Sequence, residues 1–434
     1  MSQQIVLNNN SELEIMNLVL CGIFSCGLNF GPFYLTGFFT IILSCFFLIC
    51  NIELVGFASI ILFFTCVFFD IFTIARITPY TMGKDIEREH FKIFRSVFMI
   101  KVAICIFLTD FPTLWNPRLN KTISYGISLM DAGLFGFLFN AGFTKKRTVN
   151  SLVGRRNLFL IAAGFIRLFI VNKLNYEVSP TEYGIHLNFY FILAIINILY
   201  NIYKSICNLP YLFDTTIGFS LLFAHKQLLD PEIILNNDRS TFFMQNKEGI
   251  NSIVGYFAFI LIVADFGNAY RKTNKKFLLV FIYFILSLIN YKFFLLRDIL
   301  SDPNSVHKEM SRAFFYGSFL DKNSFYVSRR LCNLNFINWG LFIDFFSFLS
   351  TYVFSHMFPI MLEKNVIIEF VSKNMMLIFI ITNLCIIPTK MYLTDTHNPL
   401  LVNICYLFIN FVIVPKGIEM FQLRPWSKVI EKNK

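Results

Sequence analysis

The sequence predicts an all-α, polytopic transmembrane helical bundle of about 13 spans, with residues 1–434 forming a single integral-membrane domain. The chain is 56% hydrophobic and only 15% charged, and its mean hydropathy is +0.61. Apolar stretches of about 18–24 residues recur from one end to the other, whereas a transmembrane barrel would show short alternating segments. A soluble monomer could not keep 56 Phe side chains from aggregating, so soluble enzyme folds are excluded.

The predicted spans are the apolar segments that lie between polar or charged breaks. The polar stretches at 77–95 and 297–332 are too short to fold alone, so one bundle is expected. The N-terminus lacks the basic start and the cleavage site of a signal peptide, so we expect the first apolar segment to be retained. In chain order, the helices are expected near residues 15–31, 33–50, 54–75, 97–114, 123–143, 157–172, 187–204, 210–226, 249–268, 277–296, 333–355, 366–388 and 398–415.

Basic residues in short loops indicate the orientation of the chain, because Lys and Arg in such loops stay on the cytosolic side. The densest clusters follow the third span (76–95), the fifth (145–156), the ninth (271–276) and the last. An odd number of spans then gives a cytosolic C-terminus and an N-terminus on the opposite face. This topology largely explains the net charge of +11. We expect no nucleic-acid binding, because the sequence has no basic soluble module.

The ten cysteines lie mostly inside apolar runs, without a CxxC pair or a Cys/His cluster. This pattern is typical of small buried side chains. We therefore expect neither a disulfide framework nor a metal site.

Ionisable side chains inside the predicted spans are the first functional candidates, because a charge at the centre of a span costs about 2.5–3.5 kcal/mol on insertion scales. The structural alternative is an ion pair inside the bundle, and Asp131 in the fifth span could neutralise Arg167 in the sixth. A lysine can also extend its ammonium to the interface. The intramembrane set is Lys101, Asp110, Asp131, Arg167, Asp265 and Asp344.

Asp110 lies where the fourth span ends on the non-cytosolic face, in the segment Leu108-Thr109-Asp110-Phe111-Pro112. Pro112 prevents the helix from continuing in regular form and frees carbonyl groups to face a cavity. Partial desolvation makes such a carboxylate a better proton acceptor. Lys121 follows eleven residues later at the start of the fifth span, so we predict that the two side chains converge at one membrane edge. An interfacial ion pair is the alternative.

Three more polar clusters fall on the same predicted face, at 180–189, 245–250 and 326–334. The first crowds hydrogen-bonding groups at the start of the seventh span, where they could hold a sugar or phosphate headgroup. A helix cap with an interfacial aromatic belt is the alternative there. In the third cluster, Arg329 and Arg330 suit bidentate contact with phosphate, although solvated or lipid-facing arginines would look the same. The coincidence of these clusters on one face favours a functional site.

At these residues the sequence resembles the GPI-anchor inositol acyltransferases, the PIG-W-like family of the eukaryotic endoplasmic reticulum. The resemblance covers roughly residues 91–340, with the motifs in the family's order. It implies thirteen spans, a lumenal N-terminus and a cytosolic C-terminus. The matching strings are DFP at 110–112, GISLMDAG at 126–133, RLF at 167–169, TEYGIHLNF at 181–189, NKEGI at 246–250 and VSRRLCNL at 327–334.

The resemblance implies transfer of a fatty acyl chain, usually palmitoyl, from acyl-CoA to the inositol 2-hydroxyl of glucosaminyl-phosphatidylinositol. Acyl-CoA would be a co-substrate, and no resident cofactor is expected. The expected partners are these two substrates and membrane lipids, and nothing in the sequence indicates an oligomeric state. The family's catalytic pair corresponds to Asp110 and Lys121 here.

Acylating a hydroxyl requires removing its proton, stabilising the oxyanion and excluding water. We assign Asp110 as the general base and Lys121 as the cation near the oxyanion or the inositol phosphate, with His186 as the alternative base. No GxSxG or reactive-Cys motif supports a covalent acyl-enzyme, so direct transfer is preferred. The predicted substrate-binding residues are Asp131, Arg167, Thr181, Glu182, Tyr183, His186, Asn188, Asn246, Glu248, Ser328, Arg329, Arg330 and Asn333.

Two other functions fit a polytopic chain with intramembrane charges. A lipid transporter or scramblase would show inverted repeats with interrupted helices in matching positions, and we find none in the sequence. A membrane acyltransferase of another family would use a buried catalytic histidine. His356 is the candidate, but it has no neighbouring Asn or Asp motif.

Overall fold

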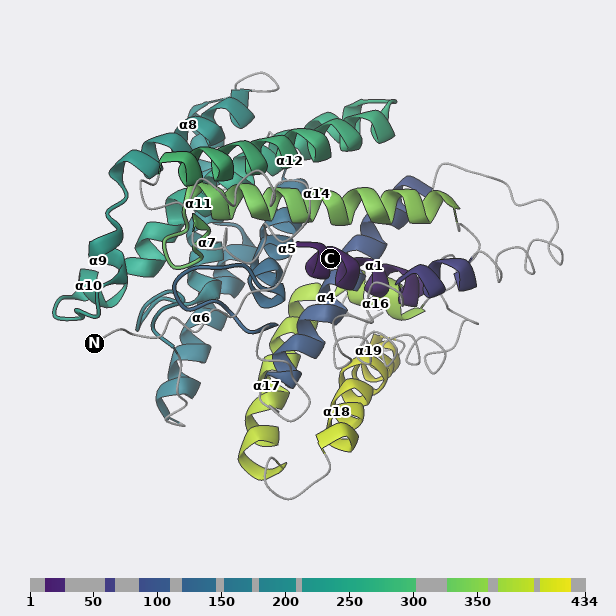
Figure 1. Cartoon of the computed structure of the whole chain (residues 1–434). Coiled ribbons are helices and arrows are strands. Elements are labelled where there is room, and N and C mark those ends of the chain that lie inside the picture. The colour runs from purple at the N-terminus through teal and green to yellow at the C-terminus, as the bar shows by residue number, and fades with distance from the viewer. Residues whose placement is uncertain are drawn as a thin grey trace. The chain divides into compact units, whose positions relative to one another are not determined.

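The computed structural model describes residues 12–27, 59–66, 86–109, 119–145, 152–173, 179–207, 213–301, 326–357, 366–393 and 399–422. The regular secondary structure within these ranges is helical throughout (Figure 1), which confirms the predicted helical class. The chain divides into two compact units, one made of residues 1–12 and 121–346 and the other of residues 13–120 and 347–434. The assignment of the chain to a single domain stays a prediction.

Five helical segments among the described residues are long and apolar enough to cross a membrane. A sixth is counted if one bent helix pair forms a single span. These segments establish a helical membrane protein, and the count of thirteen spans stays a prediction. The five are α7 (Phe189–Ile206), α11 (Lys247–Lys272), α12 (Lys276–Ser301), α14 (Leu334–Met357) and the run of α18 (Pro399–Phe408), η4 (Ile409–Ile413) and α19 (Val414–Gln422).

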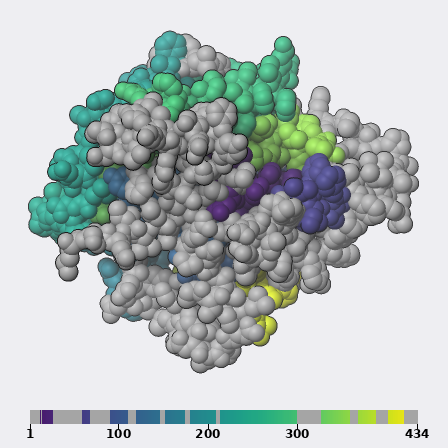
Figure 2. Space-filling model, viewed as in Figure 1, coloured from purple at the N-terminus to yellow at the C-terminus, as the bar shows by residue number. Residues whose placement is uncertain are grey.

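Helix α11 forms the core of the unit at residues 121–346. It packs against α8 (Phe213–Leu228), α5 (Leu129–Phe143) and α7, and α6 (Arg155–Lys173) packs on α7. Side chains from Ala258 to Phe266 are buried all round α11, as expected for a helix enclosed by others. By contrast, α12 exposes Phe277, Phe281 and Phe293, and its green atoms are visible at the surface in Figure 2.

Glycines allow α5 and α11 to approach closely. A Cβ atom at Gly267 of α11 would lie 2.6 Å from the carbonyl oxygen of Phe143 in α5. A Cβ atom at Gly142 would lie 3.0 Å from Cβ of Val263. Small residues at helix contacts let backbones meet in this way in membrane proteins, so the position of α5 beside α11 depends on them.

Helix α5 begins at Leu129, six residues after the predicted start near 123. The segment before it turns at Gly126, which has a φ of 120°, a conformation that other residues rarely adopt. Ser128 then caps the helix by accepting a hydrogen bond from the backbone N–H of Asp131. The apolar pattern at 123–128 therefore belongs to a turn.

In the second unit, α4 (Ile86–Leu108) packs against α16 (Val366–Lys373), α17 (Met375–Leu393) and α18. The predicted start of this span near 97 was wrong, because the helix begins eleven residues earlier. Charged residues with good helix propensity extend it, and His90 is buried beside Phe348 and Tyr352. Further along α4, Lys101 donates to the carbonyl of Val19 in α1 (Glu12–Gly27) at 2.9 Å.

The single helix predicted at 366–388 is instead two helices, α16 and α17, bent by 94°. Asn374 lies at the break, where its side-chain Nδ2 donates to the carbonyl of Phe370 at 3.1 Å. Asn side chains that bond to nearby carbonyls compete with regular helix geometry. Hydropathy alone does not register this change of direction.

The helix contact at Gly267 can be tested by adding one methyl group. We expect Gly267→Ala to lower the stability of the protein by about 1–3 kcal/mol, because the methyl overpacks the backbone of α5. Gly417→Ala in α19 is the control, since no atom lies within 4 Å of the added Cβ, and it should be neutral or stabilising by up to about 1 kcal/mol. Unfolding of both variants in detergent measures the difference. Equal stability of the two variants would contradict the close contact.

Candidate functional site

Two groups of buried charges meet at one end of the unit at residues 121–346. The Asp131–Glu182 cluster contains Asp131, Glu182, Arg329 and Lys121. The Glu248 cluster contains Glu248, Arg239 and Arg330. Arg329 and Arg330 are consecutive in the chain, so the two clusters are neighbours.

The clusters lie at the starts of α5, α7, α11 and α14, the helices that follow the four polar segments of the sequence. Contacts join these starts directly, because Arg329 pairs with Asp131 and faces Glu182, while Arg330 pairs with Glu248. The structure thus brings together the polar segments at 119–131, 180–189, 245–250 and 326–334. Their predicted location on one face of the membrane stays a prediction.

The local sequence before α5 builds the binding site of the Asp131 carboxylate. Oδ2 of Asp131 accepts hydrogen bonds from the Thr122 N–H at 3.2 Å, the Thr122 hydroxyl at 2.8 Å and the Ser128 hydroxyl at 2.8 Å. Its other oxygen, Oδ1, lies 3.0 Å from Nε of Arg329. Asp131 also lies in the first turn of α5, where the helix dipole favours a negative charge. The carboxylate is therefore buried, with three hydrogen bonds at one oxygen and an ion pair at the other.

The predicted pairing of Asp131 with Arg167 was wrong. Arg329, from a distant part of the chain, neutralises Asp131 instead. The loop before α5 explains the difference, because it turns the carboxylate toward the 326–333 segment.

Arg329 is the central cation of the Asp131–Glu182 cluster. Besides Asp131, it faces Glu182 with 3.9 Å between Nη1 and Oε2, and its Nη2 donates to the carbonyl of Thr122 at 3.4 Å. Burial tends to lower the pKa of Arg329, but the two carboxylates outweigh burial and raise that pKa. Arg329 thus stays charged in the interior and links both carboxylates.

Glu182 links the buried charges to the partly exposed Lys121. Nζ of Lys121 lies 2.7 Å from Oε1 of Glu182. Burial tends to raise the pKa of Glu182, but Lys121, Arg329 and Arg167 together lower that pKa to about 2. The Lys121 side chain is 39% exposed and that of Glu182 is 19% exposed. Negative and positive charges therefore alternate from the buried Asp131 to a partly exposed ammonium.

The loop that carries Glu182 is fixed against the start of α11. Gly184 has a φ of 98°, and a Cβ atom there would lie 2.4 Å from the carbonyl oxygen of Gln245. Asn246 accepts the N–H groups of His186 at 2.9 Å and Leu187 at 3.1 Å through its Oδ1. These bonds from the backbone to a side chain hold the loop at 181–187 against the start of α11.

Asn188 acts as the cap of α7, as the capping alternative predicts. Its Oδ1 accepts the N–H groups of Tyr190 at 3.0 Å and Phe191 at 3.3 Å. Its Nδ2 donates to the carbonyl of Gly164 at 3.1 Å, which ties the start of α7 to α6.

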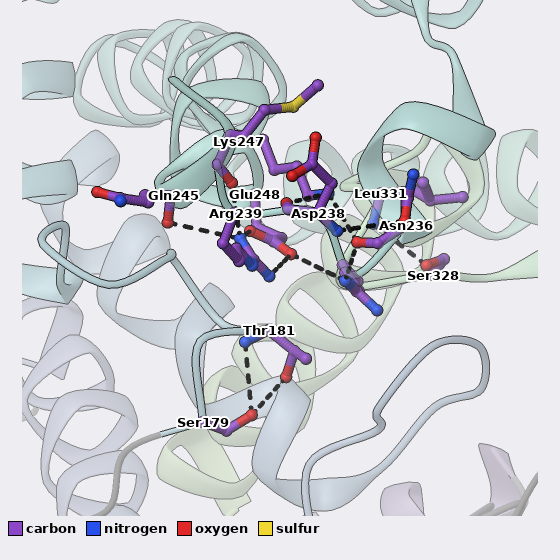
Figure 3. Close-up of polar contacts among 12 residues, drawn as sticks. Ser179, Thr181, Asn236, Asp238, Arg239, Gln245, Lys247, Glu248, Ser328 and Leu331 are labelled. Carbon is purple, nitrogen blue, oxygen red and sulfur yellow. Dashed lines mark hydrogen bonds and ion pairs between the residues drawn. The ribbon is translucent and has the colours of Figure 1, made fainter. Parts of the chain in front are cut away.

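Other polar residues of this loop are accessible. The exposed His186 ring contacts Gln245 at 3.0 Å through Nε2 and stacks on Phe242. Thr181 shares a hydrogen bond of 2.7 Å with the Ser179 hydroxyl (Figure 3). Tyr183 is buried, and burial raises the pKa of its hydroxyl. Thr181 and His186 are thus the loop side chains best placed to meet a ligand.

In the Glu248 cluster, Arg239 binds the buried carboxylate through two bonds, of 2.6 Å to Oε2 and 2.5 Å to Oε1. Arg330 donates from Nε to Oε1 of Glu248 at 3.1 Å. Figure 3 shows Arg239 and Glu248 pointing toward each other across the start of α11. The neighbouring Lys247 is fully buried and donates to the carbonyls of Asn236 at 2.7 Å and Asp238 at 3.2 Å.

Sequence reasoning missed Arg239. It lies between the short helices α9 (Pro231–Leu235) and α10 (Phe242–Gln245), in the polar segment Asn236-Asn237-Asp238-Arg239-Ser240. A single arginine in such a segment is typical of a solvated loop. No sequence signal marked it, because only the structure shows that the Glu248 carboxylate is buried and needs such a donor.

The 326–333 turn orients the two arginines. Ser328 donates from its hydroxyl to the carbonyl of Ser124, and Oδ1 of Asn333 accepts the Ser328 N–H at 3.2 Å. Nδ2 of Asn333 donates to the carbonyl of Tyr326 at 2.8 Å. Ser328 and Asn333 therefore hold the turn so that Arg329 pairs with Asp131 and Arg330 pairs with Glu248.

Asp110 lies outside the described residues, so its convergence with Lys121 stays a prediction. Of the predicted catalytic pair, the structure describes Lys121 alone, beside Glu182. Within the described ranges, no group of three His, Cys, Asp or Glu side chains could hold a metal ion.

Comparison with known proteins identifies the family. The family model described as GWT1 matches residues 17–415. The chain belongs to the GWT1 family. This family membership confirms the resemblance to the PIG-W-like proteins that the motifs indicated.

Named relatives agree with this family. A phosphatidylinositol-glycan biosynthesis class W protein of Dictyostelium discoideum is 24% identical over 418 residues, covering 81% of this chain and 79% of the relative. A GPI-anchored wall transfer protein 1 of Kluyveromyces lactis is 32% identical over 199 residues, or 42% of this chain and 44% of the relative. An uncharacterised protein of Arabidopsis thaliana is 28% identical over 356 residues, or 77% and 74%.

The low pKa of Glu182 predicts how acid affects the protein. The ionised carboxylate stabilises the fold above the ordinary glutamate pKa of 4.5, and this stabilisation is lost as the pH falls toward 2. We expect Glu182→Gln to be less stable than wild type at pH 7, with a difference that shrinks as the pH falls from about 4.5 toward 2. Unfolding in detergent across this pH range measures the difference.

Glu232→Gln serves as the control for this experiment. Glu232 is exposed in α9 and makes no ion pair among the described residues, so its variant should follow the wild-type pH dependence. A gap between wild type and Glu182→Gln that stays constant with pH would contradict the proposed ion pairing.

Proposed function

We propose that this protein is an acyl-CoA-dependent inositol O-acyltransferase of GPI-anchor biosynthesis, embedded in the membrane of the endoplasmic reticulum by multiple helices. GWT1 family membership supports the role in GPI-anchor biosynthesis. The names of relatives, which refer to GPI-anchored wall transfer and to phosphatidylinositol-glycan biosynthesis, agree with that role. The predicted topology puts the two charge clusters on the lumenal face, with a lumenal N-terminus and a cytosolic C-terminus.

The observation that carries the proposal is the position of Lys121 at the exposed end of the Asp131–Glu182 cluster. Its ammonium has three N–H donors, and one is bonded to Glu182. The other two have no acceptor among the described residues. A fixed cation with free donors can stabilise an oxyanion, because it needs little rearrangement when negative charge develops.

In the proposed reaction, the inositol 2-hydroxyl attacks the thioester carbonyl of acyl-CoA. Asp110 takes the hydroxyl proton as the new ester bond forms. The C–S bond then breaks, and Asp110 returns the proton to the thiolate, so that coenzyme A leaves as the thiol. Lys121 faces the oxyanion of the tetrahedral intermediate. The surrounding helices exclude water, which would otherwise hydrolyse the thioester.

The accessible side chains of the 179–188 loop are proposed to contact the glucosamine-inositol head. Thr181 and His186 offer hydrogen-bonding groups on this loop. The other predicted binding residues that are buried hold the loops in place. Asn246 accepts the backbone N–H of His186, and Asn333 accepts the backbone N–H of Ser328. Both substrates carry lipid tails, so they can reach the site from the bilayer.

A lipid transporter or scramblase is the second candidate. The 94° bend between α16 and α17 favours it, since discontinuous helices are common at transport sites. A carrier would move lipid across the membrane without making an acylated product.

An acyl-transfer assay on the purified full chain distinguishes these functions. With radiolabelled palmitoyl-CoA and glucosaminyl-phosphatidylinositol, wild type should produce labelled acyl-lipid. We expect Asp110→Asn to reduce the rate by about 10²- to 10⁴-fold, the range of general-base catalysis. Lys121→Met should also lower the rate strongly, with Lys121→Arg retaining more activity because it keeps the charge.

Matched variants make the result specific. Lys173→Met removes an exposed lysine at the end of α6 and should leave the rate unchanged. Thermal unfolding shows whether each variant is folded. Retained turnover in Asp110→Asn with loss in His186→Ala would assign the base to His186, and the absence of acylated product with wild type would reject the enzyme function.

A further inference from the structure

Arg167 lies in α6 at the level of the 179–188 loop. Three residues earlier, the carbonyl of Gly164 accepts the hydrogen bond from Asn188 at the start of α7. A Cβ atom at Gly164 would lie 2.6 Å from the ring of Phe191, so α6 and α7 touch at this point. Residues three apart share a helix face. Arg167 therefore lies just beyond this contact on α6, toward the loop that holds Glu182.

Arg167 differs from the other arginines near the clusters. Arg239, Arg329 and Arg330 all pair with buried carboxylates. Arg167 is half-buried, and no described residue forms a hydrogen bond or an ion pair with it. Its positive charge contributes to lowering the pKa of Glu182, in agreement with its place on α6 beside the helix contact at Gly164.

The charges around Glu182 do not balance. Lys121, Arg167 and Arg329 are positive, whereas Asp131 and Glu182 are negative. Three positive and two negative charges leave one positive charge uncompensated. A charge that is partly removed from water is costly without a partner, so the cluster favours binding of one anion.

The Glu248 cluster offers no equivalent. Its two arginines share the single Glu248 carboxylate and both bond to it, while the neighbouring Lys247 is fully buried and donates to the carbonyls of Asn236 and Asp238. A ligand cannot reach that ammonium. Among the described arginines near the two clusters, Arg167 is thus the one that pairs with no carboxylate.

Apolar side chains on α6 indicate that the anion belongs to a lipid. Phe165, Ile166 and Phe169 flank Arg167, and each is more than half exposed. Acyl chains can lie along these side chains while a headgroup phosphate meets the guanidinium. A free anion would gain nothing from this apolar surface.

We propose that Arg167 binds the phosphodiester of the phosphatidylinositol substrate. The guanidinium suits two parallel hydrogen bonds to phosphate oxygens, and one phosphodiester charge balances the cluster. In phosphatidylinositol, the phosphate is attached to the ring carbon next to the 2-hydroxyl. Binding at Arg167 would thus hold that hydroxyl close to the bound phosphate, on the side of α6 that meets the start of α7. This assignment rests on the proposed function for its substrate.

Steady-state kinetics of the purified full chain test the proposal. We expect Arg167→Gln to raise KM for glucosaminyl-phosphatidylinositol by about 10- to 100-fold, the value of a lost charged contact. The kcat and the KM for palmitoyl-CoA should stay close to wild type. Arg167→Lys should give an intermediate KM, because it keeps the charge and loses the bidentate geometry.

Arg155→Gln is the matched control. It removes an exposed arginine at the opposite end of α6 and should not change either KM. A fall in kcat with an unchanged KM for the lipid would overturn the proposal.

A binding measurement separates this proposal from the proposed enzyme function. Fluorescent phosphatidylinositol and a matched fluorescent diacylglycerol, which lacks the phosphate, are titrated into wild type and Arg167→Gln. We expect the variant to lose affinity for phosphatidylinositol alone. Equal phosphatidylinositol affinity of the two proteins would overturn the role of Arg167, whether or not the wild type transfers acyl chains.

Discussion

The pairing of buried carboxylates with two consecutive arginines is the interaction on which this end of the molecule depends. Asp131 and Glu248 are almost completely buried, and each would be strongly destabilising if its cation were removed, by about 3–5 kcal/mol. The pairs join the starts of α5 and α11 to the turn before α14. Because the partners come from distant parts of the chain, they determine which loops meet.

The Asp131–Glu182 cluster also gives the site a direction. Its innermost carboxylate is held by three hydrogen bonds and an ion pair, whereas its outermost group, the Lys121 ammonium, is partly exposed and keeps free donors. The buried end of the cluster is anchored by protein partners, so the cation at its outer end is held in a fixed place. Fixed charges of this kind favour acyl transfer, because they need little reorganisation when negative charge develops on the oxyanion.

The sequence predicted much of the fold because length and apolarity suffice to define α7, α11, α12 and α14 as helices. It did not predict the bend at Asn374, which depends on one side chain bonding to a backbone carbonyl, or the late start of α5 at its Ser128 cap. Apolar patterns report burial and carry no information about such local competition for hydrogen bonds.

The sequence predicted which residues belong to the candidate site, but only part of how those residues pair. Motif strings identified Asp131, Glu182, Glu248 and both arginines. Chain order suggested Arg167 as the partner of Asp131, but loop geometry decides that pairing in favour of Arg329. Arg239 could not be recognised from the sequence, because nothing in a polar loop distinguishes a buried arginine from a solvated one.

A single peptide bond separates the arginine of one cluster from the arginine of the other. The turn that carries them is held by Ser328 and Asn333, so both guanidinium groups depend on the same short segment. A change that disrupts this turn would remove a cation from Asp131 and from Glu248 together. The two clusters therefore form and fail as one unit.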